Sequence, residues 1–120
     1  MLFRSAVAIT QSGETADTLG ALREAKRLGA RSVAICNVVG SMATREADGT
    51  IYTHAGPEIG VASTKAFTTQ LAALTMLVIA LAKHHGADAE RERTLVERLV
   101  ELPGLMEKTL TLDQIGRAHV

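Results

Sequence analysis

Two short polar segments each lie where an apolar, strand-like run gives way to a helical pattern. The first, residues 10–15 (TQSGET), contains no Lys or Arg but offers the hydroxyls of Thr10, Ser12 and Thr15 and the amide of Gln11. A helix start leaves its first backbone N–H groups unpaired, and together with the helix dipole they favour an anion. The segment could therefore hold a phosphate with neutral donors alone, although most Ser/Thr-rich helix starts are simply capped helices.

The same segment differs from the common nucleotide-binding loops. It lacks the Gly-Lys-Ser/Thr of a P-loop, and the chain has no GxGxxG that would predict dinucleotide binding. Gly13 would allow the backbone to approach a ligand closely. Because carboxylates repel phosphate, we expect Glu14 and Asp17 to lie along the helix flank as partners of the helix dipole.

The second segment, residues 54–64 (HAGPEIGVAST), leads directly into a long apolar helix. Val61 and Ala62 can offer only main-chain groups to a ligand, whereas Ser63 can also offer a hydroxyl. Ser63 and Thr64 are natural caps for the helix. Glu58 is a candidate general base, but a solvated or ion-paired role is favoured because no partner carboxylate is visible.

The remaining reactive side chains have ordinary structural interpretations. Cys36 ends an apolar run and is predicted to be an inert core thiol. His54 could line a pocket, Lys65 is expected at the surface, and the adjacent His84 and His85 suit the negative end of a helix. No Cys/His cluster has the spacing of a metal site, so we predict neither a metal nor a cofactor.

Composition limits the class of protein. The chain has 120 residues, the size of one domain, and a formal net charge of +0 from 13 basic and 13 acidic residues, which argues against nucleic-acid or membrane-surface binding. Aromatic residues make up only 2% of the chain, so the core must be aliphatic. The single Cys, the lack of a signal peptide and an apolar run (71–82) too short to span a bilayer predict a cytoplasmic protein.

Strand-like and helical patterns alternate along the chain, which predicts an α/β fold with a parallel sheet. The expected strands are residues 6–10, 32–36 and 50–53. The expected helices run from an N-cap at Ser12 to Gly29 as the residue after the helix end, over 41–47, over 63–83, and as a pair within 87–114 broken at Pro103 and Gly104. The 63–83 helix is apolar nearly all round, with Phe67, Leu71, Leu74, Val78 and Leu81 on one face, so we expect it to cover a sheet and a partner surface. Three strands make a thin sheet, so part of the domain is expected to be missing.

Three stretches of this sequence carry a family resemblance. QSGETADTLGALREAKRLGA, AICNV and AGPEIGVASTKAFTTQLAALTMLVIALA closely resemble the first sugar-isomerase (SIS) domain of the glutamine–fructose-6-phosphate aminotransferase family. The resemblance covers residues 6–114 and implies an SIS-type three-layer αβα fold with a parallel sheet, incomplete at its N-terminal side. It also implies a sugar-phosphate site: Thr10, Gln11, Ser12 and Thr15 hold the phosphate, and Val61, Ala62 and Ser63 contact the sugar. Thr10 replaces the usual Ser but keeps the hydroxyl.

The resemblance further implies an enzyme that makes glucosamine 6-phosphate from fructose 6-phosphate and glutamine in amino-sugar (UDP-GlcNAc) biosynthesis. A glutaminase domain and a second SIS domain are the implied partners in the parent chain, which is expected to form a homodimer. The family's catalytic residues lie outside the matching stretch, so this chain alone is expected to be inactive. Two alternatives use the same hydroxyl turn: a phosphosugar-sensing SIS module of a regulator, and a stand-alone SIS sugar-phosphate isomerase.

Four segments are expected along the chain. Residues 1–5 and 115–120 resemble translated sequencing-adapter DNA and are expected to be non-native, with ordinary tails as the alternative. Residues 6–86 are expected to form the partial SIS domain. Residues 87–114 are expected to form a helical connector towards a second SIS domain.

Overall fold

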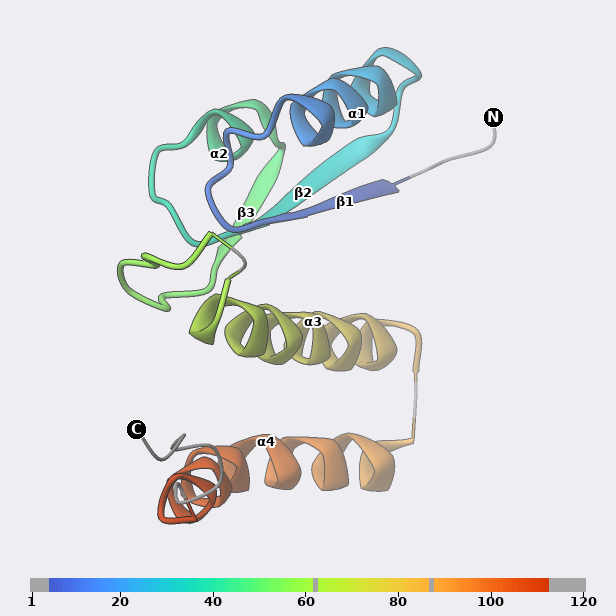
Figure 1. The fold of residues 1–120 in the computed structure, drawn as a ribbon. Coiled ribbons are helices and arrows are strands. Elements are labelled where there is room, and N and C mark those ends of the chain that lie inside the picture. Colours follow the sequence, from blue (N-terminus) through green and yellow to red (C-terminus); the bar gives the residue numbers. More distant parts are fainter. Residues whose placement is uncertain (1–4, 62, 87, 113–120) are drawn as a thin grey trace, which may run out of the picture. The chain divides into compact units, whose positions relative to one another are not determined.

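The computed structural model describes residues 5–61, 63–86 and 88–112, which form three strands and four helices (Figure 1). The expected alternation of strands and helices is confirmed. In chain order the elements are β1 (Ser5–Thr10), α1 (Ala16–Arg27), β2 (Arg31–Cys36), α2 (Met42–Glu46), β3 (Gly49–Tyr52), α3 (Lys65–His84) and α4 (Ala89–Leu110).

The three strands form one parallel sheet in the order β1-β2-β3. Thr10 at the end of β1 lies beside Cys36, and Cys36 lies beside Tyr52 at the end of β3. The carboxyl ends of all three strands therefore meet at one edge of the sheet. Ligands of open parallel α/β sheets bind at such an edge, and both polar segments begin there.

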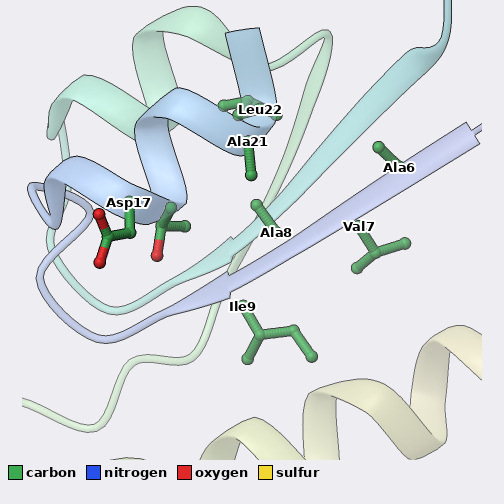
Figure 2. A pocket seen from close by; sticks show the side chains of 8 residues that line it. Ala6, Val7, Ala8, Ile9, Asp17, Ala21 and Leu22 are labelled. Atoms are coloured by element: carbon green, nitrogen blue, oxygen red, sulfur yellow. The ribbon is translucent and has the colours of Figure 1, made fainter. Parts of the chain in front are cut away.

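The core between α1 and the sheet is aliphatic, as the composition predicted. Leu19, Ala34 and Ala43 form a buried cluster to which α1, β2 and α2 each contribute one side chain. Ala6 and Ala8 of β1 point toward α1, whereas Val7 and Ile9 point to the opposite face (Figure 2). Small residues on the covered face allow the helix to pack closely on the sheet.

β1 is an edge strand. Among the described residues no strand pairs with its outer side, and Val7 and Ile9 remain 46% and 44% exposed. An open apolar groove of about 410 Å³ runs along this strand, bordered on the other side by residues of α1 such as Asp17 and Leu22 (Figure 2). An unpaired apolar edge of this kind agrees with the expectation of an incomplete sheet.

The predicted start of α1 is wrong, and its predicted end is right. The helix begins at Ala16 with Thr15 as the N-cap, not at Ser12, because the chain first makes a turn in which Gly13 has φ +72°. At the other end Gly29 has φ +83°, its N–H bonds the carbonyl of Lys26, and the N–H of Ala30 bonds Ala25. These two bonds are the helix-ending pattern that a glycine in this position favours.

The chain forms two compact units, Met1–Met76 and Leu77–Val120, with the boundary inside α3. The described residues leave most of the predicted apolar face of α3 uncovered: Phe67, Leu71, Val78 and Leu81 are each about half exposed, and Leu74 is partly buried. The buried residues of the helix are Ala66, Ala73 and Ile79. The predicted apolar run, 71–82, is only part of α3. The helix Lys65–His84 contains an 18-residue window of mean hydropathy 1.6, so it is long and apolar enough to cross a membrane by length and composition alone, a test that core helices of soluble proteins also pass.

The expected pair of C-terminal helices is a single helix, α4, with Pro103 inside it. Asp88 is the N-cap, and its carboxylate accepts the N–H of Glu90 at 3.1 Å. A proline lacks one N–H and removes only one helical bond, so a helix can continue through it with a local kink. None of the described residues of α4 is buried.

Candidate functional site

The first polar segment is a turn shaped by its own hydroxyls. Thr10 is buried at the end of β1, and its Oγ1 accepts the N–H of Gly13 at 3.1 Å. Ser12 Oγ accepts the N–H of Glu14 at 3.2 Å. A hydroxyl that accepts one hydrogen bond still has its own hydrogen to donate, so both side chains remain possible donors to a ligand.

Gly13 is required by crowding inside the protein. A Cβ at this position would lie 2.1 Å from Ser41 Oγ and 2.9 Å from Cys36 Sγ. The sequence predicts that Gly13 permits close approach of a ligand, whereas the close approach that the structure shows is to these two side chains. Cys36 is fully buried, and its Sγ lies 3.4 Å from Ser41 Oγ, as predicted for a core thiol.

The short helix α2 holds the turn from the side. The N–H of Ala43 donates to the carbonyl of Gly13 at 2.9 Å, and the N–H of Met42 donates to Glu14 Oε1 at 2.8 Å. Glu14 therefore does not lie along the flank of α1 as predicted. Its charge is directed at a backbone amide, and this pairing reduces its repulsion of an anion nearby.

With Ser12 as the predicted N-cap, the free amides would be those directly after it, but the structure places the free amides further along the chain. The N–H groups of Gly13 and Glu14 are already bonded within the turn. The first helical amide bond of α1 runs from Leu19 to Thr15, so the N–H groups of residues 16–18 are the ones that precede the helical bonding pattern. Thr15 is exposed, and its side chain makes no capping bond, which leaves this hydroxyl beside those amides.

The second polar segment is closed by the carboxylate of Glu58. The carboxylate accepts the N–H of Thr64 at 3.0 Å and that of Ala66 at 3.2 Å, and Thr64 Oγ1 donates to it at 3.0 Å. The N–H of Gly60 also donates to it, at 3.3 Å. These backbone amides lower the pKa of the Glu58 carboxyl to about 2.

The base role weighed for Glu58 gains no support, because a carboxyl with a lowered pKa is a weak proton acceptor. The side chain is partly exposed, in keeping with the favoured solvated role. It is not paired with a cation in the described residues, because its partners are amides and a hydroxyl. Glu58 also takes the role predicted for Ser63 and Thr64, since its carboxylate accepts the amides of Thr64 and Ala66 at the start of α3.

The residues predicted to contact the sugar lie between the amides that Glu58 binds. Val61 is fully exposed, and Ser63 is half-buried with φ +57°, a conformation that a non-glycine residue rarely adopts. The N–H of Ser63 donates to the carbonyl of Gly60 at 3.2 Å. The third predicted residue, Ala62, lies outside the described residues.

One residue that the sequence interpretation did not single out connects the two segments. Asn37 follows the last residue of β2, and its N–H donates to the carbonyl of Gln11 at 3.2 Å. Its side-chain Oδ1 accepts the N–H of Ala55 at 2.8 Å, and its Nδ2 donates to the carbonyl of Gly56 at 2.7 Å. The signal in the sequence that could have identified Asn37 is its position as a polar residue directly after the central strand.

The histidines and acidic residues form no metal site in the part of the chain that the structure describes. His54 begins the second segment with φ +51°, and its ring centroid lies 6.1 Å from that of Tyr52. His84 and His85 lie at the end of α3 with their ring centroids 5.5 Å apart.

The fold and these two segments are those of a known domain family. The family model described as "SIS domain" matches residues 5–80, so the chain belongs to the SIS domain family. The resemblance to the aminotransferase family is also confirmed. The chain is 59% identical to a glutamine–fructose-6-phosphate aminotransferase (isomerizing) of Thermococcus kodakarensis, over 92% of this chain and 19% of that protein. It is 56% identical to the Yersinia pseudotuberculosis protein of the same name, over 90% of this chain and 18% of that one.

Solved structures agree with this assignment. The C-terminal domain of glucosamine-fructose-6-phosphate aminotransferase from Francisella tularensis superposes with a TM-score of 0.85 at 45% identity, covering 91% of this chain and 31% of that one. A putative phosphosugar isomerase from Silicibacter pomeroyi superposes with a TM-score of 0.68 at 37% identity, covering 82% of this chain and 28% of that one. The chain spans less than a fifth of the length of the two aminotransferases named above. Since the family match extends to residue 80, most of α3 is a helix of the SIS domain.

Proposed function

We propose that this chain is the sugar-phosphate-binding part of an isomerising amidotransferase that makes glucosamine 6-phosphate from fructose 6-phosphate and glutamine. The observation that carries the proposal is the 59% identity to an aminotransferase of that name across 92% of the chain. The two polar segments support it, because both begin at the carboxyl-end edge of the same parallel sheet.

In this proposal the first turn holds the phosphate. Thr10, Gln11, Ser12 and Thr15 contribute side-chain donors, and the first amides of α1 add the positive end of the helix dipole. No Lys or Arg is needed in the turn, because hydrogen bonds to a charged phosphate are stronger than those between neutral groups. Glu14 is compatible with this role since its carboxylate accepts the amide of Met42.

The sugar lies against the second segment, through Val61, Ala62 and Ser63. The main support for this half is the left-handed conformation of Ser63, held between amides that Glu58 binds. A non-glycine residue kept in such a conformation is typical of sites where the backbone must present its groups in one direction.

In this proposal none of the described residues acts as a catalytic residue. Glu58 is committed to backbone amides, and Cys36 is buried under the first turn. We propose that a glutaminase domain and a second SIS domain of the parent chain supply the chemistry, that the parent is a homodimer, and that it acts in the cytoplasm in UDP-GlcNAc biosynthesis.

The deciding experiment is an assay of the full-length protein that contains this segment. It should form glucosamine 6-phosphate from fructose 6-phosphate and glutamine. A protein that binds fructose 6-phosphate but has no turnover would favour the sensing module. Isomerisation of a sugar phosphate without glutamine use would favour the stand-alone isomerase.

A further inference from the structure

Asn37 makes hydrogen bonds to both candidate ligand-binding segments, one through its backbone and two through its side chain, and no other described residue does so. Its backbone N–H bonds Gln11 in the first turn, and its side-chain amide bonds Ala55 and Gly56 in the second segment. In a third hydrogen bond of this side chain, Thr53 Oγ1 donates to Asn37 Oδ1 at 3.1 Å.

The orientation of this side chain is set by its partners. An N–H can only donate and a carbonyl can only accept, so the amide of Ala55 must face Oδ1 and the carbonyl of Gly56 must face Nδ2. Both contacts are short, at 2.8 and 2.7 Å. The side chain can therefore form both hydrogen bonds only with one particular backbone arrangement of residues 55 and 56.

That backbone arrangement is not a relaxed one. His54 has φ +51° and Gly56 has φ +73°, so both neighbours of Ala55 have left-handed backbone conformations. A non-glycine residue with positive φ persists only when its surroundings hold it. The Asn37 side chain bonds the two residues directly after His54, so it helps to hold this conformation.

We propose that Asn37 is a positioning residue that fixes the second segment relative to the phosphate-holding turn, so that one ligand can contact both. The inference rests on the proposed sugar-phosphate site. Because the Gln11 bond uses the backbone of Asn37 and the Gly56 bond uses its side chain, a substitution at this position releases the second segment without removing the link to the first.

The test compares a ligand that needs both segments with one that needs only the first. In the full-length protein, Asn37→Ala should raise KM for fructose 6-phosphate by roughly 5- to 50-fold, the effect of losing two good hydrogen bonds. The inhibition constant of inorganic phosphate, which contacts only the first turn, should stay within about two-fold of the wild-type value.

Two further variants keep the proposal falsifiable. Asn37→Asp retains the acceptor for Ala55 but places an oxygen opposite the carbonyl of Gly56, so it should show the same selective rise in KM. It takes the place of Asn37→Ala if that variant does not fold. Thr53→Val removes only the hydroxyl contact and should change KM little. Thermal unfolding of each variant serves as the control for folding.

The outcomes separate clearly. Unchanged KM in folded Asn37→Ala and Asn37→Asp, or an equal loss of fructose 6-phosphate and phosphate affinity, would overturn the positioning role. A wild-type protein that does not respond to fructose 6-phosphate at all would overturn the proposed function instead.

Discussion

The backbone N–H of Ala43 donates a hydrogen bond to the carbonyl of Gly13 at 2.9 Å, which fastens α2 to the first polar turn. This contact brings the turn so close to Ser41 and Cys36 that position 13 has no room for a side chain. The turn proposed to hold phosphate therefore packs closely against two neighbouring elements, β2 and α2.

Replacing Gly13 with Ala should destabilise the fold strongly. The new Cβ would lie 2.1 Å from Ser41 Oγ, and φ +72° is unfavourable for alanine, so we expect a loss of about 2–4 kcal/mol in the free energy of unfolding. Denaturant unfolding measures this loss. Gly20→Ala is the matched control, because Gly20 lies within α1 and no atom lies within 4 Å of its added Cβ. That variant should be neutral or up to about 1 kcal/mol more stable.

Removing two hydroxyls from the first turn should weaken binding of fructose 6-phosphate. The double substitution Ser12→Ala and Thr15→Ala in the full-length protein is expected to cost about 2–4 kcal/mol, taking about 1–2 kcal/mol for each hydrogen bond to a charged group. Titration calorimetry measures the change. Thr94→Ala, which removes a hydroxyl bonded only within α4, should leave the affinity as it is. An unchanged affinity in the double variant would contradict the phosphate assignment.

The Glu58 carboxylate should make stability depend on pH in acid. Its folded pKa of about 2 lies below the unfolded value of about 4.3, so its stabilisation is present above that unfolded value and is lost as pH falls through the folded one. The difference in free energy of unfolding between wild type and Glu58→Gln should be largest at neutral pH and should shrink between about pH 4.5 and 2. Urea unfolding at several pH values tests this. A constant difference over that range would argue against the amide contacts, and Glu97→Gln on the exposed surface of α4 provides the control.

The isolated 120-residue chain should form no glucosamine 6-phosphate and should self-associate. Val7 and Ile9 lie half-exposed on an edge strand, and apolar edge strands pair with other chains. Light scattering should detect the association, and Val7→Lys should reduce it because a charged edge resists pairing. A stable wild-type monomer, or measurable synthesis by the isolated chain, would contradict these expectations.

Local patterns in the sequence predicted most of the fold. The three apolar runs became β1, β2 and β3 within one residue of their expected bounds, and Gly29 ended α1 as expected. These features depend on neighbouring residues, because strand burial and helix termination are decided by side chains and φ angles close in sequence. The α/β class followed from the same alternation.

The errors fell where a local pattern allowed more than one solution. Ser12 and Thr15 are both acceptable N-caps, and the turn at Gly13 decided for Thr15. Thr64 looked like a capping residue, yet its N–H is bound by Glu58, which is six positions away. A break at Pro103 was equally reasonable, but α4 continues through it.

The sequence by itself determined which segments are strands, which carry hydroxyl donors and which family the chain resembles. Only the tertiary structure decided how the two polar segments are held together. The side chain of Asn37 reaches Gly56 across 19 positions, and the carboxylate of Glu14 reaches Met42 across 28. Hydrogen bonds between residues so far apart along the chain exist only once parallel strands have brought their carboxyl ends to one edge, so no local pattern predicts them.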